Sequence, residues 1–598
     1  MNRAKRIWRT VLLLCLAVQL LGSSLFSVKA AEKAFPSGLH YRDLPKTIEQ
    51  FVHEHHETTC GMSLVVYDRD GVLYEKAYGY MDKEAKKEAD LETVYEWGST
   101  SKLLIWVSVM QLYEEGKIDL HQDIKHYLPE GFLQNVRFDK PITMLDLMNH
   151  QAGFQDTYFI QTPHPEEMKS LEEVLRSKQP IQVYAPGEHT AYSNWGAALA
   201  AFIVQKIAGM NYVEYVHKHI FQPLHMAHTS ISSLYRDNSW VDQQRQKLTC
   251  YDTEGKKIGG AGRYYIYVYP AGSAAGTISD LAKFARALTP KDKQPSPLFK
   301  NQATQKEMYT ATSFYGSSKV EKFYHGFFAN EYGVQTIGHG GNTFGCSTML
   351  QFDPVSGVGM VVMTNQAHET IYTDQMYELI YGKFTDSTLG HIKREVPKGL
   401  LLNMRGILEG PLSFVGALGV RTYSEEDLDN WWFEENGIVQ TPFSDFLLST
   451  PKALMNVLLL LLFIVAGLYG LLNLVLGALI LDPIKKKKGK CIVYPLRKLS
   501  YTLCVPMGLV LLNFILCFFR LLNGYKTGDI GSVTSYQVQS ALFGILAIAM
   551  AILIVTAKKN AYQEATKKDK RKFLVTGGFA LLQIAVIVFF DLYQFWTL

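Results

Sequence analysis

The chain has 598 residues, of which 47% are hydrophobic, and its formal net charge at pH 7 is +4. It is too long for one ordinary domain and too apolar for a disordered protein. A net charge this close to zero gives no indication of nucleic-acid binding.

The first 30 residues have the organisation of an export signal. MNRAKRIWR is basic, Thr10 to Leu21 is apolar, and Ala30 offers a small residue for cleavage. A first membrane anchor is the alternative, but the apolar run is shorter than the ~20 residues that a span needs. We therefore predict a signal peptide over residues 1–30 and export of the segment that follows.

Few cysteines fall in the predicted exported part. Of the seven in the chain, only Cys60, Cys250 and Cys346 lie there. Three scattered cysteines do not build a disulfide framework. We therefore expect a large hydrophobic core to stabilise this part of the protein.

Residues 31–385 are predicted to form one α+β domain. Asp43 to Glu57 has the periodicity of an amphipathic helix, and Met62 to Asp82 reads as two strands around a turn. A mostly helical stretch runs on to about Leu288, residues 334–365 supply three more strands, and Thr370 to Phe384 is expected to be a closing helix. Strands at both ends of the domain predict one antiparallel sheet, flanked by helices and carrying an inserted helical subdomain.

Residues 386–452 are less regular. We expect a membrane-proximal linker there, with room for a short packed helix around Trp431 and Trp432.

Residues 453–598 contain four apolar stretches of about the length needed to cross a bilayer. They cover residues 453–481, 499–519, 538–557 and 573–590. Basic sequences, LDPIKKKKGK and KKNAYQEATKKDKRK, follow the first and the third stretch, and Lys and Arg favour the cytoplasmic side. We therefore predict a multi-pass protein of the cell membrane, with residues 31–385 on the extracytoplasmic face. Buried helices of a soluble protein are the alternative.

The four stretches contain almost no ionisable residue away from their ends. Transport paths usually need charged groups inside the bilayer. We therefore expect an anchor in the lipid bilayer rather than a pump or channel. Whether a membrane transporter or a cell-wall component is a partner is left open by the sequence.

A serine and a lysine stand at the entrance of an apolar helix. Ser99 and Lys102 are three residues apart, so their side chains share one helix face. The helix N-terminus carries a partial positive charge, and burial disfavours the charged form of lysine. Lys102 can then accept the proton of Ser99 and turn it into a nucleophile. Chance is the alternative, and Ser449 to Lys452 is a second match that we treat as accidental.

The sequence Tyr192-Ser193-Asn194 opens another apolar helix. Tyr192 could share or relay the proton, and Asn194 could orient the lysine and a substrate amide. Taken alone, the motif also fits a surface turn and a helix cap.

The sequence His339-Gly340-Gly341 lies on a late predicted strand. Two glycines let a substrate backbone approach the strand edge closely. His339 could contact a substrate carboxylate or assist proton movement. Taken alone, the motif also fits a tight turn with a surface histidine.

Together, and in this order, the three motifs resemble the serine β-lactamase and penicillin-binding protein superfamily. The likeness is greatest to class C β-lactamases and the related esterases and D-aminopeptidases. It covers roughly residues 35–385 and includes four further stretches: Glu96–Lys102, Ile142–Phe154, Pro186-Gly187 and Ala271–Leu288. His339 stands where β-lactamases carry lysine, a replacement common in the esterase and peptidase branches, which weakens the case for efficient β-lactam hydrolysis.

The resemblance implies an acyl-enzyme on Ser99, with the proton handled by Lys102 and Tyr192. It implies an oxyanion hole made of the backbone N–H groups of Ser99 and Asn342. The implied substrate contacts are Asn194, His339, Gly340 and Gly341, and no cofactor is expected.

No metal is expected either. His53, His55 and His56 form a small cluster but lack the His-Glu-x-x-His spacing that puts two ligands on one helix face.

We therefore predict a membrane-anchored extracytoplasmic serine hydrolase that cleaves an amide, peptide or ester bond. Its expected substrates are peptide-like or ester small molecules, such as cell-wall peptides or peptides that contain D-amino acids. A penicillin-binding sensor and a non-catalytic penicillin-binding-like module are the alternatives.

Overall fold

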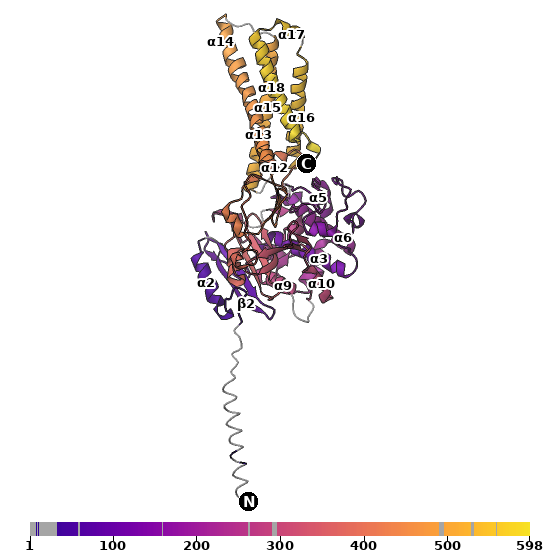
Figure 1. The fold of residues 1–598 in the computed structure, drawn as a ribbon, viewed down its shortest axis with the longest axis vertical. Coiled ribbons are helices and arrows are strands. Elements are labelled where there is room, and N and C mark those ends of the chain that lie inside the picture. Colours follow the sequence, from indigo (N-terminus) through magenta and orange to yellow (C-terminus); the bar gives the residue numbers. More distant parts are fainter. Residues whose placement is uncertain are drawn as a thin grey trace.

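The computed structural model describes residues 8, 10, 33–57, 60–157, 160–260, 264–289, 296–489, 495–527, 532–557 and 559–597. The predicted signal peptide lies outside these residues except for two positions. Figure 1 shows a mixed α/β body with a bundle of long helices rising from one end.

A nine-stranded antiparallel sheet forms the centre of the body. The strand order is β11-β12-β13-β14-β15-β16-β1-β2-β3. The bounds are β1 Gly61–Tyr67, β2 Val72–Asp82, β3 Lys87–Glu88, β11 Ser313–Phe314, β12 Glu321–Tyr324, β13 Phe327–Glu331, β14 Gln335–Asn342, β15 Ser347–Phe352 and β16 Gly359–Thr364. The early and late strands join where β1 pairs with β16, with Val65 opposite Val361. This confirms the predicted antiparallel sheet.

Helices cover both faces of this sheet. On one face α2 (Leu44–Glu54) buries Leu44, Ile48 and Val52, as its amphipathic pattern predicts. On the other face lie α3 (Lys102–Glu114), α6 (Asn194–Ala208) and α9 (Ile278–Leu288). Helix α3 is buried almost all round because it packs against α6 and lies within the main core.

The inserted region between β2 and β11 is mostly short helices and small sheets of two or three strands. Its remaining helices are α4 Met144–Met148, α5 Leu171–Ser177, α7 Tyr212–Val216, α8 Ser239–Arg245 and α10 Gln302–Met308. Its strands are β4 Tyr95–Glu96, β5 Gln161–Thr162, β6 Thr229–Ser230, β7 Thr249–Tyr251, β8 Lys257–Gly260, β9 Tyr265–Ile266 and β10 Ala275–Gly276.

The closing helix predicted over Thr370 to Phe384 is shorter than expected. The structure has only helical turns there, η7 (Gln375–Tyr377), α11 (Glu378–Tyr381) and η8 (Phe384–Asp386). Gly382 interrupts them because its φ of +82° is outside the range of a right-handed helix.

The prediction of an irregular linker over residues 386–452 was wrong. This segment forms a second antiparallel sheet of order β18-β17-β21-β20-β19, which we call the membrane-proximal sheet because the candidate membrane spans follow it in the chain. Its elements are β17 Leu401–Asn403, α12 Ser413–Leu418, β18 Val420–Arg421, β19 Phe433–Glu435, β20 Ile438–Gln440 and β21 Asp445–Leu448. Trp432 is buried against Leu401, Val439 and Phe446 rather than in a helix.

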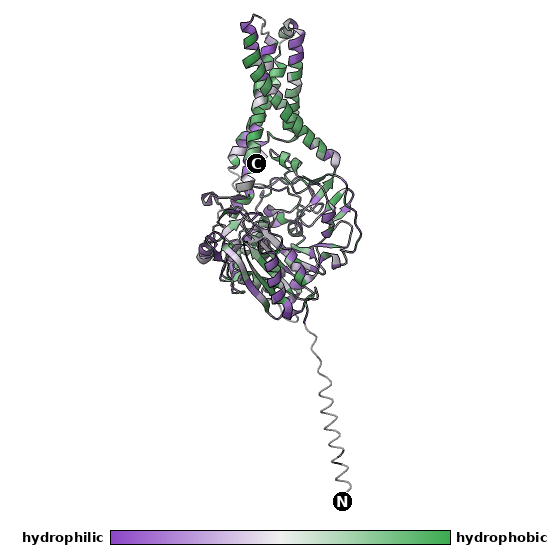
Figure 2. Ribbon diagram, turned by 90° about the vertical axis from the view of Figure 1, so that its left-hand side faces the viewer, coloured by the Kyte–Doolittle hydropathy of each residue, from purple (hydrophilic) through white to green (hydrophobic). Residues whose placement is uncertain are grey.

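Four C-terminal helices are long and apolar enough to cross a membrane, as predicted. They are α13 (Thr450–Leu472), which continues through η10 (Asn473–Leu481) and α14 (Asp482–Lys487), then α15 (Pro495–Thr527), α16 (Val533–Val555) and α18 (Lys567–Phe589); the short α17 (Lys559–Glu564) precedes the last. In Figure 2, hydrophobic residues cover most of the length of the helical bundle. Only Ser449 separates β21 from α13, so the membrane-proximal sheet is tied directly to the first of these helices.

Candidate active site

Ser99 and Lys102 lie at the start of α3, as the sequence predicts. Ser99 is in the short 3-10 turn η2 (Gly98–Ser101), and Lys102 is the first residue of the α-helix. Ser99 is partly exposed, whereas Lys102 has no exposed surface. The serine hydroxyl is therefore accessible from outside while the amine lies beneath it.

Lys102 sits in a closed hydrogen-bond network. Its Nζ lies 2.9 Å from Ser99 Oγ, 2.8 Å from Asn194 Oδ1 and 2.7 Å from the carbonyl oxygen of Ala271. Burial holds the pKa of Lys102 well below its usual value, and the charge of Arg405 lowers it further. A neutral amine has two hydrogens and one lone pair. Of its three partners only the Ser99 hydroxyl can donate to that lone pair, because the two carbonyl oxygens only accept.

Close backbone contact places the strand β14 against η2. A Cβ added to Gly341 would lie 1.9 Å from the carbonyl oxygen of Trp97, and one added to Gly98 would lie 2.7 Å from the amide nitrogen of Asn342. Only glycines permit this approach. It brings the backbone of Asn342, at the exposed end of β14, beside the turn that carries Ser99.

Tyr192 is buried next to this pair. Its ring centroid lies 4.8 Å from Lys102 Nζ. Its hydroxyl is near Ser99, but the two do not have the geometry of a full hydrogen bond, and no other described residue bonds to this hydroxyl. Burial raises the pKa of Tyr192, with a smaller opposing effect of Ser99, so the phenol is neutral at pH 7. Ser193, the next residue, accepts a hydrogen bond from the Gly196 N–H and caps α6.

His339 is a neutral histidine with one free nitrogen. Its Nδ1 lies 2.6 Å from the carbonyl oxygen of Gly340, which can only accept, so Nδ1 carries the proton. Its Nε2 is buried and has no hydrogen-bond partner in the described part of the chain. Burial lowers the pKa of His339 to about 3, and protonation of Lys102 would lower it further. The ring lies 6.1 Å from that of Tyr192.

His150 is a further residue of the cluster that we did not predict. Its ring centroid is 4.2 Å from that of Tyr192, and its Nδ1 accepts a hydrogen bond from the Ser193 N–H at 3.2 Å. Burial lowers its pKa, so it is also neutral. The available signal was its position inside the family-like stretch Ile142–Phe154.

The membrane-proximal sheet also reaches the site. Arg405 Cζ lies 4.9 Å from the ring centroid of Tyr192, and its Nε lies 2.9 Å from Asp156 Oδ2. The Phe443 ring packs 6.3 Å from that of Tyr192. No sequence pattern indicated these residues, because they follow strands of only two to four residues.

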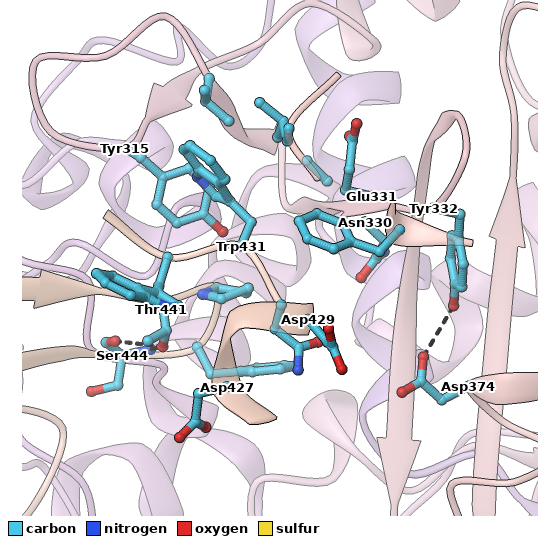
Figure 3. A pocket seen from close by; sticks show the side chains of 18 of the residues that line it. Tyr315, Asn330, Glu331, Tyr332, Asp374, Asp427, Asp429, Trp431, Thr441 and Ser444 are labelled. Atoms are coloured by element: carbon cyan, nitrogen blue, oxygen red, sulfur yellow. Dashed lines mark hydrogen bonds between the residues drawn. The ribbon is translucent and has the colours of Figure 1, made fainter. Parts of the chain in front are cut away.

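A cavity of about 800 Å³ lies between the edge of the main sheet and the membrane-proximal sheet. In Figure 3, Tyr315 lies beside Trp431, Asn330, Glu331 and Tyr332 line the main-sheet side, and Asp427 and Asp429 line the other side. Burial raises the pKa of Glu331 to about 7. Ser99 does not line this cavity, but Arg405 and Phe443 do, so they stand between the cavity and Tyr192.

The structure thus brings every predicted site residue to one place. Ser99, Lys102 and Asn194 are directly connected, Tyr192 and His339 pack beside them, and the Gly340-Gly341-Asn342 strand closes the site. His53, His55 and His56, which were not expected to bind a metal, lie elsewhere, at the end of α2.

The chain is similar to several known proteins. A family model described as Beta-lactamase matches residues 44–380. Protein flp from Staphylococcus aureus (strain MRSA252) is 23% identical over 314 residues, which cover 52% of this chain and 60% of that protein. The N-acetylmuramyl-L-alanine amidase of Bacillus subtilis (strain 168) is 26% identical over 194 residues, which cover 29% of this chain and 43% of that protein. The solved octameric penicillin-binding protein homologue from Pyrococcus abyssi has a TM-score of 0.47 at 19% identity, covering 68% of this chain and 89% of that chain.

The matches to these two curated relatives span less than two thirds of the relatives' own length. The family model, in contrast, spans more than half of this chain. The chain therefore belongs to the beta-lactamase family.

Proposed function

We propose that the protein is a membrane-anchored serine hydrolase that cleaves an amide, peptide or ester bond through an acyl-enzyme on Ser99. The observation that carries the proposal is the buried amine of Lys102, whose Nζ lies 2.9 Å from Ser99 Oγ. Its other two described partners are carbonyl oxygens, which cannot donate a hydrogen bond to it. A buried lysine with a lowered pKa is a recognised general base.

Acylation begins when Ser99 Oγ attacks the substrate carbonyl and its proton passes to Lys102 Nζ. The carbonyl oxygen becomes an oxyanion, which the N–H groups of Ser99 and Asn342 stabilise. As the carbon–heteroatom bond breaks, a proton passes from Lys102, with Tyr192 as relay, to the leaving amine or alcohol. The acyl group stays on Ser99, and the Lys102 amine is neutral again.

Deacylation reverses the roles with water as the nucleophile. Water loses one proton to the basic groups of the site as it attacks the acyl carbonyl, and Ser99 Oγ regains one as it leaves. The free Nε2 of His339 is an acceptor available for a hydrogen bond in either step. Because burial keeps His339 neutral and weakly basic, hydrogen-bond acceptance by its Nε2 is better supported than proton transfer or charge attraction of a substrate carboxylate.

The substrate class is an extracytoplasmic peptide-like amide or an ester. The amidase named above acts, by its name, on an N-acetylmuramyl-L-alanine bond, and this favours a cell-wall peptide here. The four apolar helices favour a substrate close to the membrane. In this proposal residues 31–385 are the catalytic domain outside the cell, residues 1–30 the export signal and the helices the anchor.

The test is covalent labelling of the full-length, detergent-solubilised protein with a fluorophosphonate probe. We expect one adduct on Ser99, found by intact mass and peptide mapping, and none in Ser99→Ala. Ser449→Ala is the matched control, because Ser449 belongs to the second Ser-x-x-Lys sequence and its side chain does not cap α13. Equal labelling of wild type and Ser99→Ala would refute the proposal.

A further inference from the structure

The loop that carries Tyr192 is paired with the membrane-proximal sheet. The Tyr192 N–H donates to the Phe443 carbonyl at 3.2 Å, and the Asp445 N–H donates to the Thr190 carbonyl at 2.9 Å. Ala191 and Ser444 form an antiparallel bridge between these two bonds. The start of β21 thus acts as an extra strand beside the Tyr192 loop.

A buried ion pair fixes this contact. Asp445 Oδ1 lies 3.1 Å from Lys322 Nζ of β12, and both side chains are at most 3% exposed. Asp445 Oδ2 accepts a hydrogen bond from the Thr190 N–H at 2.9 Å, and Lys322 also donates to Thr190 Oγ1 at 2.8 Å. The position of the Tyr192 loop therefore depends on residues of both sheets.

Arg405 extends from the same sheet to the other side of the site. Its carbonyl oxygen accepts from the Asp156 N–H at 3.1 Å, and its Nε pairs with the Asp156 carboxylate at 2.9 Å. Next to it, Gln155 Oε1 accepts from the N–H groups of Leu408 and Glu409. These contacts hold the Arg405 guanidinium 4.9 Å from the Tyr192 ring centroid.

Five titratable or charged groups surround Lys102. His150 and His339 are neutral because burial lowers their pKa values, and Tyr192 is neutral because burial raises its own. Arginine and aspartate side chains are charged at pH 7. Arg405 and Asp156 are therefore the two charges of this set, and they act on the Lys102 amine with opposite signs.

We propose that Arg405 is a positioning residue of the active site, supplied by the membrane-proximal sheet, which acts on the Ser99–Lys102 pair through its charge and through its contact with Tyr192. The sheet is then part of the catalytic apparatus, although it lies beyond residues 44–380 that the family model matches. This inference rests on the proposed function, because it concerns the proton on Lys102.

The sign of the effect follows from Coulomb's law. The positive Arg405 disfavours protonated Lys102, so its removal raises the pKa of Lys102, whereas removal of the negative Asp156 lowers it. A protonated Lys102 cannot accept the Ser99 proton. In a plot of labelling rate against pH, the decrease on the acidic side, which we call the acidic limb, should therefore follow the Lys102 pKa.

The experiment measures the rate of fluorophosphonate labelling of Ser99 against pH in the full-length protein. We expect Arg405→Gln to move the acidic limb to higher pH and Asp156→Asn to move it to lower pH, each by roughly 1 pH unit. The double variant should return toward wild type. Arg405→Lys keeps the charge and should keep the limb near its wild-type position.

Arg421→Gln is the matched control. Arg421 belongs to the same sheet and lines the same cavity, but it pairs with Asp427 and should not move the limb. A purely structural role of Arg405 would lower the rate equally at every pH. Limbs that stay at the wild-type pH in Arg405→Gln and Asp156→Asn would overturn the inference and leave the proposed function standing. Labelling that does not depend on Ser99 would overturn both.

Discussion

At the scale of single residues, the site combines one buried amine with neutral neighbours. Lys102, Tyr192 and His339 are all buried, whereas Ser99 and Asn342, like Asn194 and Gly340, reach solvent. In the proposed mechanism the Ser99 hydroxyl is thus accessible to a substrate, whereas the Lys102 amine that accepts its proton is shielded from water. This separation explains how lysine, an ordinary cation at the protein surface, can act as a base here.

The lowered pKa of His339 predicts how stability depends on pH. The folded-state pKa is about 3 and the ordinary value is 6.5, so below about pH 6.5 the unfolded chain binds a proton that the folded chain does not. Stability is therefore lost as the pH falls, by up to about 1.4 kcal/mol per pH unit for one fully buried histidine.

We expect the thermal unfolding midpoint of the wild type to decrease when the pH is lowered from 7 to 5. The decrease should be smaller in His339→Gln. His126→Gln, at an exposed position, is the control. Identical pH dependence in wild type and His339→Gln would show that His339 is not buried as a neutral ring.

At the scale of elements, the contact between β14 and η2 forms the proposed oxyanion hole. Gly341 lies directly against Trp97 and Ser99, where a Cβ would meet backbone atoms that cannot move aside. The neighbouring Gly340 differs, because a Cβ there would meet only the flexible end of Met349 at 3.0 Å. The two glycines of one motif therefore have unequal importance.

We predict that Gly341→Ala lowers the labelling rate of Ser99 by about 10²–10³-fold, the usual effect of losing one oxyanion donor. Gly340→Ala should stay within about tenfold of wild type, because a side-chain tip can shift. Labelling rates of both variants, with circular dichroism to confirm folding, decide the matter. A Gly341→Ala protein that labels as fast as Gly340→Ala would exclude the proposed oxyanion geometry.

The ion pair between Lys322 and Asp445 joins the main sheet to the membrane-proximal sheet. Removal of one partner leaves a buried charge without compensation, so Asp445→Ala should destabilise the protein by about 3–5 kcal/mol. The double variant Lys322→Met with Asp445→Ala removes both charges and should recover part of the loss. Denaturant unfolding of the single and double variants measures this, and simple additivity of the two losses would contradict a direct pair.

At the scale of the whole molecule, features encoded in local sequence patterns could be predicted from the sequence, whereas most contacts between distant parts of the chain could not. The Ser99–Lys102 arrangement needs only helical spacing, and the apolar stretches after residue 450 need only length, so both could be predicted. The prediction that Tyr192 and His339 lie in the same site as Ser99 came from the family resemblance. Arg405 and Phe443 could not be predicted, because they belong to strands and turns too short to show periodicity, and their positions depend on sheet pairing.

The proposed membrane topology predicts which surfaces are accessible from outside the cell. We expect an impermeant maleimide to label Glu166→Cys, an exposed site on the body, in intact cells. Lys488→Cys, exposed beyond the first apolar helix, should be labelled only after the cells are opened, in a Cys491→Ser background. Labelling of Lys488→Cys in intact cells would reverse the proposed orientation.

The proposed mechanism requires a neutral Lys102 that activates Ser99. Its most direct test compares the rate of fluorophosphonate labelling of Ser99 at pH 7 in wild type and in a folded Lys102→Met variant. We expect the variant to label more slowly by about 10²–10⁴-fold, the usual contribution of general-base catalysis. A Lys102→Met protein that labels at the wild-type rate would contradict it.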